Sequence, residues 1–595
     1  MTTIADGTDT AEIVIEVDGA PLLPLVAELL VSAEVDTSLF LPGQFSLVFQ
    51  GERSDVLDAG FVIGVMVSIE VTEEDVPSPL MLGEITAIEI DYGPEGDLTI
   101  IRGLDLSHRL MRGTKTRAIP DTTISAAVEL VLAEAGVEPG EIIPTEALYS
   151  QLTQGNINDW AFIQQLAAEV GYDAFCEDGL FCFRPQAAAA EGLEPSESYE
   201  SPTMPTQLVL GENLIRLRGS VSGAEQVATV QVRGWNPLLA EPVIGEATAE
   251  SLSASVDDFT VEPAALAEEL GGIQYVATDR VYSNEGAAEA KANSLAWSLA
   301  GASAELQGEC LGNPSIQAGS QVSLGMAGPP FDGQYIVSEA KHRYSPGSGG
   351  FTTWFSIGGR RDRSLLGLSG GGSGGTQTVR PSIPGVVVAR VVDSDDPEGQ
   401  GRVKLSFPWL DETYVTDYVR NVQAGAGLDY GCLFVPEVGA EVLVAFDRGD
   451  INYPYVIGGL YNGLSKPEPR PDIEGTVNER RIMSRMRHML QFLDGEDRQG
   501  ILLITGEEDC SIKIDAMEQA IQIVSAGMVS IEAAEEISIT AGGDLSISTE
   551  GALSLEGSDV TITGTSVTIT GEGDVGIEAA GEVSVAAAMI MLGEG

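Results

Sequence analysis

The C-terminal part of the chain carries a strictly repeated pattern of apolar and polar positions. Pairs of aliphatic residues two positions apart recur every eight residues, with two steps of seven midway. Side chains two positions apart lie on one face of a strand, so each pair predicts a short strand with one apolar face. The pairs are Ile521 and Ile523, Val529 and Ile531, Ile537 and Ile539, Leu545 and Ile547, Leu553 and Leu555, Val560 and Ile562, Val567 and Ile569, Val575 and Ile577, and Val583 and Val585.

These repeats gain too little stability in a single chain. Burying two aliphatic side chains contributes roughly 3–6 kcal/mol, whereas ordering eight residues costs about 8–16 kcal/mol. Glycines between the pairs mark corners. We therefore expect residues 500–595 to form an intertwined triple-stranded β-helix, a trimeric prism whose core consists of these pairs. Single-chain β-helices and calcium-binding nonapeptide arrays have other periods or motifs.

The rest of the chain is predicted to be mainly β, with small helices. Period-2 alternation predicts strands throughout residues 1–115. Residues 122–136 and 158–171 instead carry apolar residues at helical spacing, each followed by a terminating glycine. A hairpin is expected at 172–185, and strands resume after it.

Composition shifts divide the chain further. Residues 369–384 contain SGGGSGG and predict a flexible Gly/Ser linker. We expect a hub region at 1–368, a compact β domain at 385–463, a connector at 464–499 and the prism at 500–595.

Charge and cysteine content limit the classes of function. The net charge of −59 argues against nucleic acid as a partner and against an anionic membrane surface, because both require basic residues. Five scattered cysteines suggest free thiols rather than a disulfide framework. The N-terminus does not resemble a signal peptide, and no apolar run is long enough for a transmembrane helix.

Formal matches to catalytic motifs have poor contexts. GEGDVG at 571–576 lies among repeats without a following helix, and GGSGG at 371–375 lies in the linker. The three histidines are far apart in sequence and show no metal-ligand spacing. The acidic loop 393–399 lacks the full calcium-loop spacing, which favours a solvated hairpin. We expect no enzymatic activity, no cofactor and no metal.

Several segments resemble the VgrG-type spike of contractile injection systems, related to the hub and spike of contractile phage tails. DPEGQGRVKLSFPWL at 396–410 and YGCLFVPEVGAEVLVAFDRGDINYPYVIGGLYNG at 430–463 resemble the OB-fold domain of that family. NDWAFIQQLAAEVGYDAF and VRGWNP resemble its hub. RHMLQFLDGEDRQGILLIT at 487–505 resembles the start of its spike helix.

The resemblance implies a homotrimer whose hub contains two tube-like β-barrels per chain and adapts a threefold spike to a sixfold inner tube. It further implies baseplate partners and a membrane-puncturing needle that pierces its target transiently. A PAAR-type protein would cap the tip at Met589, Ile590, Met591 and Leu592. No effector domain follows the needle in this sequence, and effector cargo is left open as a partner.

The main hypothesis is therefore a structural spike, made and assembled in the cytoplasm as part of a phage tail-like particle. Whether that particle is anchored or released is left open. The alternative is a trimeric adhesive or receptor-binding fibre.

Overall fold

A computed structural model describes most of the chain, and strands dominate it as the sequence predicts. The described residues are 11–73, 76–94, 96–189, 206–224, 226–236, 239–251, 254–256, 263–278, 280–346, 350–358, 383–467, 475–591 and 593. The chain divides into two compact units, Met1–Pro467 and Glu468–Gly595. Residues 369–382 of the predicted linker lie outside the described residues.

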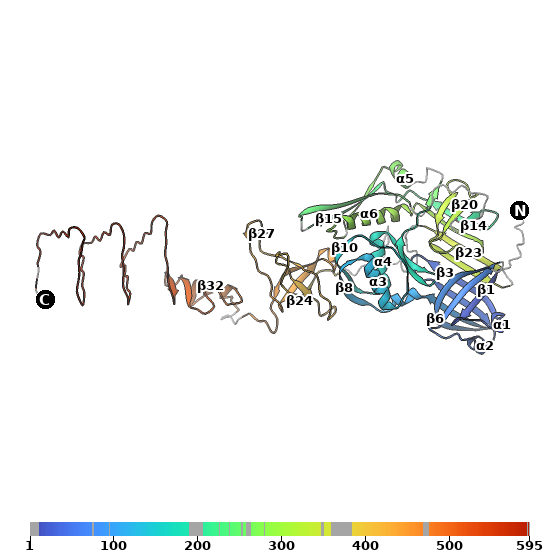
Figure 1. Ribbon diagram of the computed structural model, residues 1–595, viewed down its shortest axis with the longest axis horizontal. Coiled ribbons are helices and arrows are strands. Elements are labelled where there is room, and N and C mark those ends of the chain that lie inside the picture. Colours follow the sequence, from blue (N-terminus) through green and yellow to red (C-terminus); the bar gives the residue numbers. More distant parts are fainter. Residues whose placement is uncertain are drawn as a thin grey trace. The chain divides into compact units, whose positions relative to one another are not determined.

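An 11-stranded sheet runs through the first unit and joins segments far apart in sequence. Its order is β14-β19-β23-β22-β3-β4-β7-β6-β5-β1-β2. The junction is the antiparallel pair β22–β3, in which Tyr344 lies opposite Ala33 and Glu339 opposite Ser38 (Figure 1). The early strands are β1 Glu12–Val17, β2 Ala20–Pro21, β3 Leu30–Ser38, β4 Gln44–Gln50, β5 Met66–Glu73, β6 Val76–Gly93 and β7 Gly96–Asp105. The late strands are β14 Leu214–Val221, β19 Ala304–Leu311, β22 Glu339–Ser345 and β23 Gly350–Ile357.

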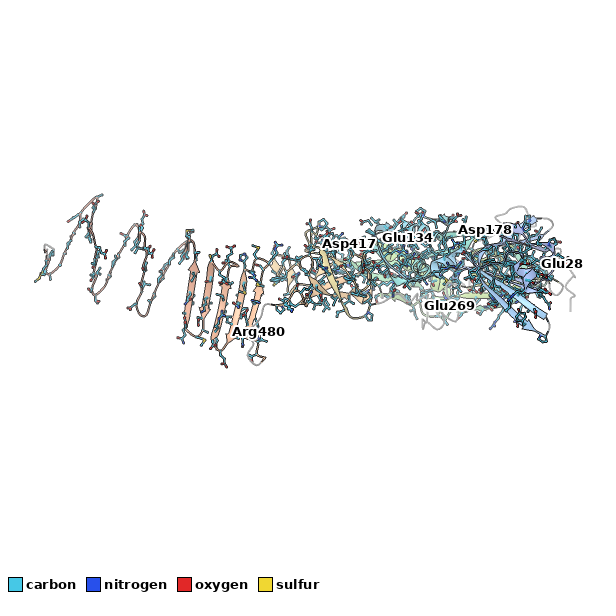
Figure 2. The ribbon with its side chains drawn as sticks, turned by 90° about the horizontal axis from the view of Figure 1, so that it is seen from below. Glu28, Glu134, Asp178, Glu269, Asp417 and Arg480 are labelled. Atoms are coloured by element: carbon cyan, nitrogen blue, oxygen red, sulfur yellow. The ribbon has the colours of Figure 1, made fainter. Side chains whose placement is uncertain are left out.

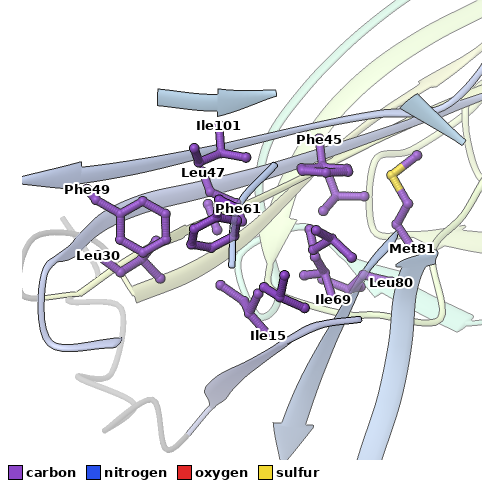
Figure 3. Close-up of a cluster of buried hydrophobic side chains, with 14 of the residues drawn as sticks. Ile15, Leu30, Phe45, Leu47, Phe49, Phe61, Ile69, Leu80, Met81 and Ile101 are labelled. Carbon is purple, nitrogen blue, oxygen red and sulfur yellow. The ribbon is translucent and has the colours of Figure 1, made fainter. Parts of the chain in front are cut away.

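The early strands surround the first hydrophobic core. Alternate residues of β4, namely Phe45, Leu47 and Phe49, point inward and are almost fully buried, as period 2 requires. Figure 3 shows them packed with Ile69 and Phe61. Two short helices, α1 Pro24–Ala27 and α2 Arg53–Leu57, lie in this region.

The two predicted helices are confirmed, together with their caps. Helix α3 is Ile124–Ala135 and ends at Gly136, which has a φ of 66°. Helix α4 is Asp159–Val170, and the Asn158 side chain accepts a hydrogen bond from the Ala161 N–H. They pack with β8 Lys115–Thr123, β9 Pro139–Ile142, β10 Leu148–Ile157, β11 Tyr172–Glu177 and β12 Leu180–Pro185 in a second core, beside the 3₁₀ helix η1 Leu106–Met111.

The predicted hairpin is β11–β12, and its register separates its two cysteines. Cys176 lies opposite Phe181, and Cys182 lies opposite Phe175. The two thiols are therefore not cross-strand partners. Both are free, Cys182 buried and Cys176 half-buried.

A third core forms where the chain returns to the large sheet. It includes Leu306, Val322, Tyr335 and Phe355, all almost fully buried. A four-stranded sheet covers it, in the order β13-β20-β21-β17. Those strands are β13 Thr206–Val209, β17 Ala254–Val256, β20 Gln321–Gly325 and β21 Gly333–Ile336.

The longest described helix, α6 Glu285–Ala300, was not predicted from the sequence. It packs on a three-stranded sheet through small residues, including Ala288 and Ala292. The strands are β15 Thr229–Asn236, β16 Glu241–Thr248 and β18 Gln274–Ala277, and the short helix α5 Pro263–Glu269 precedes β18. A Cβ atom on Gly245 of β16 would overlap the backbone of Ala288, so the helix approaches the sheet as closely as glycine allows.

We expect Gly245→Ala to destabilise the hub by about 1–3 kcal/mol, because α6 must move away from the sheet to admit one methyl group. Gly325→Ala is the matched control, because a Cβ there meets nothing within 4 Å. Guanidinium unfolding of the two variants would test this. Equal midpoints for both would contradict the tight approach.

A buried histidine in β22 makes stability depend on pH. The His342 side chain is 1% exposed, and its Nδ1 lies 3.0 Å from Thr353 Oγ1. Burial lowers the pKa of His342 to about 4, against about 6.5 in an unfolded chain. Because the unfolded state then binds more protons between these values, stability is lost as the pH falls from about 6.5 toward 4.

We expect lowering the pH from 7 to 5 to cost about 2 kcal/mol through this residue. Calorimetry of the chain and of His342→Gln at both pH values would isolate that contribution, since all other groups are shared. The same pH dependence in both proteins would rule it out.

The remaining part of the first unit is a five-stranded β domain in the order β25-β24-β29-β30-β26. Its strands are β24 Val386–Asp393, β25 Lys404–Ser406, β26 Arg420–Asn421, β29 Glu441–Phe446 and β30 Pro454–Leu460, and the 3₁₀ turn η3 Asp447–Gly449 links the last two long strands. Phe407, Val442 and Val444 are fully buried in its core.

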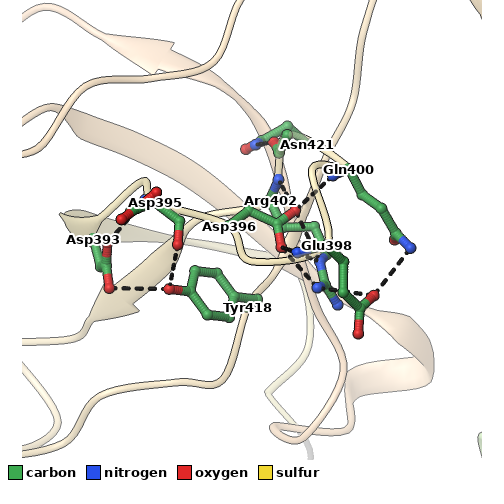
Figure 4. A network of polar contacts seen from close by, with 9 residues as sticks. Asp393, Asp395, Asp396, Glu398, Gln400, Arg402, Tyr418 and Asn421 are labelled. Carbon is green, nitrogen blue, oxygen red and sulfur yellow. Dashed lines mark hydrogen bonds and ion pairs between the residues drawn. The ribbon is translucent and has the colours of Figure 1, made fainter.

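The acidic loop of this domain folds back on its own chain (Figure 4). Asp396 accepts hydrogen bonds from the backbone N–H groups of Glu398, Gln400 and Arg402. Arg402 Nη2 also lies 2.7 Å from Asp396 Oδ1, and its hydrogen bonds hold the pKa of Asp396 well below its usual range. Asp396 therefore closes a hairpin turn, which agrees with the favoured interpretation of this loop.

This domain is fixed directly to the hub. The hydroxyl of Tyr414, a residue 2% exposed, lies 3.1 Å from Gln151 Nε2 and 3.3 Å from Thr153 Oγ1. Arg448 donates to the carbonyl of Thr278 at 2.6 Å. Hydrogen bonds from polar side chains thus hold the domain against β10 and the segment after β18.

Candidate functional site

The second unit begins with an antiparallel sheet of five strands in sequence order, lying side by side in Figure 2. They are β31 Glu479–Met483, β32 Met489–Gly495, β33 Arg498–Ile504, β34 Cys510–Asp515 and β35 Ala520–Ser525. We call them the root sheet. β31 and β32 fall inside the stretch that sequence analysis placed in the connector.

The register of the root sheet aligns apolar side chains in two rows on one face. One row is Phe492, Ile501, Ile514 and Ile521, with Arg480 opposite Phe492 at the β31 end, and the other is Ile482, Leu490, Leu503, Ile512 and Ile523. Most of these side chains are exposed, Ile501 by 37% and Ile521 by 72%. From β32 to β35 this face is apolar and exposed among the described residues, which marks it as an interaction surface.

The opposite face is mixed. One of its rows is Gln491, Leu502, Lys513 and Gln522, and Lys513 pairs with Asp515 at 2.8 Å. Leu493, on the same face, is 6% exposed. The two faces therefore differ: one exposes apolar side chains, and the other combines polar side chains with partly buried apolar ones.

Intrachain backbone pairing ends where the octads continue. The last such bond runs from the Ala526 N–H to the Asp509 carbonyl at 2.8 Å. Among residues 527–591, which the structure describes, no backbone-to-backbone hydrogen bond is made and no helix or strand is present. The backbone groups of this segment therefore have no backbone partners among the described residues, although backbone N–H and C=O groups need partners when they are removed from water.

The predicted core residues of the repeats are not buried within the single chain, which differs from what a core position requires. All of them lie in this extended segment or in β35, and each is at least half exposed. The first members of the pairs are Ile521, Val529, Ile537, Leu545, Leu553, Val560, Val567, Val575 and Val583, exposed by 72%, 55%, 53%, 59%, 58%, 56%, 54%, 54% and 50%. The second members are Ile523, Ile531, Ile539, Ile547, Leu555, Ile562, Ile569, Ile577 and Val585, exposed by 59%, 69%, 67%, 63%, 66%, 69%, 70%, 71% and 68%.

The physical reason for this exposure is the extended backbone itself. One side of a two-residue strand face has no second layer of its own chain to pack against, so an aliphatic pair such as Val567 and Ile569 stays in water. Their burial in the core of a trimer therefore stays a prediction. From the second pair onward, the second residue of each pair is always the more exposed, so successive octads repeat one geometry.

Corners follow the period of the pairs. The backbone bends at 526–527, 534–535, 542–543, 550–551, 558, 565, 572–573, 580–581 and 588. In the two seven-residue steps the bend is a single residue, Ser558 or Thr565, whereas the eight-residue steps between Ile523 and Val583 bend over two residues. Deleting one residue therefore shortens the corner and leaves the apolar pair unchanged.

Three of the four predicted tip residues are described. Met589, Ile590 and Met591 are 76%, 55% and 83% exposed, and Leu592 lies outside the described residues. Contact with a tip protein stays a prediction.

Sequence reasoning missed the upstream part of the apolar face. The pairs Leu490/Phe492, Ile501/Leu503 and Ile512/Ile514 follow the same i, i+2 rule but are spaced by eleven residues. Longer strands contribute to the difference, since β32 and β33 have seven residues each and β34 has six. A search for such pairs at variable spacing would have found them.

Within the described residues, no cluster of three or more His, Cys, Asp or Glu side chains is arranged to hold a metal ion. The histidines lie on separate elements, with His108 in η1, His342 in β22 and His488 just before β32. No helix in the described part is long and apolar enough to cross a bilayer.

Two family models match the first unit. The type VI secretion system/phage-baseplate injector OB domain matches residues 387–461, and the Alg8 N-terminal domain matches residues 58–345. The first match coincides with the five-stranded domain from β24 to β30.

Curated relatives match over a short part of their length. The type VI secretion system spike protein VgrG2a of Pseudomonas aeruginosa is 36% identical over 99 residues, which are 15% of this chain and 11% of that protein. VgrG1a of the same organism is 31% identical over 161 residues, 23% of each protein. The chain thus spans about a tenth of the first relative's length.

Solved structures extend the likeness in fold. The Francisella PdpA-VgrG complex in its half-lidded form aligns with a TM-score of 0.52 and 10% identity, covering 86% of this chain and 88% of that one. The lidded form gives 0.51, with 87% and 81% covered. By its OB domain, its matching relatives and this fold, the chain is similar to the VgrG-type spike proteins of contractile injection systems.

Proposed function

We propose that the chain is the central spike of a contractile injection system and acts as a homotrimer. The observation that carries this proposal is the series of exposed aliphatic pairs from Ile501 to Val585, on a backbone that makes no backbone-to-backbone hydrogen bond over the described residues 527–591. If three chains wind around one axis, the aliphatic pairs become buried and the backbone groups find hydrogen-bond partners in the other chains.

In the proposed prism each octad forms one side of a triangle. Its inward pair packs against the pairs of the two partner chains, and the backbone groups bond between chains. This supplies the stabilisation that the single chain lacks, since about 3–6 kcal/mol of apolar burial per octad does not offset the cost of ordering eight residues. Acidic residues remain outside, with Lys513 the only basic residue after Gly500.

The same proposal assigns functions to the hub, the needle and the tip. The hub, with its two tube-like barrels, adapts the threefold spike to the inner tube and baseplate, and the needle transmits the force of contraction to the target membrane. A PAAR-type protein caps the tip at Met589–Leu592. The spike is non-enzymatic, and its particle is assembled in the cytoplasm.

Light scattering of the purified chain tests the proposal directly. We expect a mass of three chains at micromolar concentration. A monomeric mass would exclude the prism and the spike with it. An adhesive fibre, the alternative, predicts a trimer that binds intact target cells without any tube or baseplate protein, so cell binding by the purified protein separates the two.

A further inference from the structure

A hairpin projects from the five-stranded domain between β26 and β29 (Figure 1). Its strands are β27 Ala426–Gly427 and β28 Tyr430–Gly431, joined by a two-residue turn. We call residues 422–434 the arm. Its stem is closed by hydrogen bonds from the Cys432 N–H to the Gly425 carbonyl at 3.0 Å and from the Phe434 N–H to the Gln423 side chain at 3.0 Å.

The arm is apolar, and none of the structure's described segments forms a layer over it. Every residue from 426 to 434 is exposed, including Leu428 at 89%, Leu433 at 75%, Tyr430 at 72% and Phe434 at 61%. Its only charged residue is Asp429. Because an isolated two-stranded ribbon is marginally stable in water, an exposed apolar arm of this kind requires a partner surface.

The same domain exposes an apolar surface of its own. The outward residues of β24 include Val386, Val388 and Val392, which are 52%, 42% and 38% exposed, and Arg390 lies exposed between the last two. Trp409 extends this surface, because its indole N–H donates to the Val388 carbonyl at 2.8 Å while the residue stays 52% exposed. We call the three valines and Trp409 the β24 face. The chain therefore carries both a nearly uncharged projection and an exposed apolar strand surface.

We propose that the arm docks on the β24 face of a second copy of the chain, an inference that rests on the trimer proposed above. Repeated around a threefold axis, this head-to-tail contact closes into a ring. The charged residues of the two surfaces, Asp429 on the arm and Arg390 on β24, are opposite in sign, whereas most other surfaces of two copies repel each other in a chain of net charge −59.

Chain length favours a second copy over a separate protein. Residues 461–478 connect β30 to β31, and a fully extended chain of that length spans at most about 65 Å. Once three root sheets associate, this connection keeps the three domains within reach of one another. Tethering gives an effective concentration on the order of millimolar, so a small apolar contact is enough.

Cross-linking from Cys432 in the full-length chain tests the contact. This thiol is exposed, whereas Cys182 and Cys310 are buried and Cys176 and Cys510 half-buried. A benzophenone maleimide on Cys432, photolysed in trimers assembled from mixed ¹⁴N and ¹⁵N chains, should join peptides of different isotope. We expect the acceptor peptides to contain residues 386–392 or 409, and Cys432→Ser to give none.

A variant pair adds a second readout. We expect Leu433→Asp with Phe434→Asp to move the arm off its site and to reduce cross-copy product from Cys432 at least tenfold. Leu25→Asp, in α1 and 79% exposed in the wild type, should leave the yield unchanged.

The outcomes separate the two proposals. A trimeric mass with cross-links only inside one copy, to residues outside 383–467, or to another protein in assembled particles would overturn the arm contact and leave the trimer standing. A monomeric mass would overturn both.

Discussion

We expect the double substitution Ile537→Asp with Ile539→Asp, which replaces one inward pair of the needle, to unfold the needle around that octad. In the proposed prism the change places two carboxylates from each of three chains on the axis, in direct apposition. Taking an ionised group out of water costs several kcal/mol, and the burial of the aliphatic pair is lost as well. Water therefore enters the core of the prism at this octad, and a protease can reach its backbone.

The matched control is Ser538→Asp, because Ser538 lies between the two isoleucines and faces the other side of the strand. It adds the same charge to a surface that is already acidic. We expect limited proteolysis to cut near residue 537 in the double variant only, and its trimer to dissociate at a lower guanidinium concentration. Identical digestion patterns for the two variants would contradict an inward pair.

Asp159→Ala is expected to destabilise the hub by about 3–5 kcal/mol, since removing one partner from a buried ion network leaves unpaired charge. Asp159 begins α4, and its side chain is 3% exposed. Its carboxylate lies 2.6 Å from Lys115 Nζ and 2.6 Å from Arg117 Nη2. Gln154 Nε2 donates to the same group at 3.0 Å, so one carboxylate ties α4 to β8 and β10.

Glu134 provides a control with the same cations. Its side chain is 48% exposed, and it lies 2.5 Å from Arg117 Nη1. Exposed pairs contribute about 0–1 kcal/mol, so Glu134→Ala should be nearly neutral in chemical denaturation. Equal losses of stability for the two variants would show that burial does not set the strength of this network.

The sequence predicts a helix well where the capping residues and the spacing of the apolar residues indicate the same boundaries. Helices α3 and α4 were predicted because an apolar stripe ends at a glycine in each, and the structure gives Gly136 and Gly171 left-handed φ values of 66° and 72°. Helix α6 was missed because its buried face is mostly alanine, which carries little periodic contrast. The glycine that admits it, Gly245, lies about forty residues earlier in the sequence.

The sequence shows only part of the candidate site. The octad pairs are visible because they recur at nearly constant short spacing, whereas the root-sheet pairs are eleven residues apart and fall outside that period. In the proposed prism, pairing involves separate chains, so the burial of the octad pairs stays a prediction. The arm gave no periodic signal, since its apolar residues are irregularly placed.

The single-residue bends at Ser558 and Thr565 have a consequence for alignment. A perfectly uniform repeat would let one chain slide by one octad along its partners at little cost, because every octad would meet an equivalent neighbour. Two short corners in succession break that equivalence: a slipped chain sets a short corner against a long one on both sides of the mismatch. In the proposed trimer the two short corners would therefore fix the register of the three chains, so that all three end at the same level at the tip.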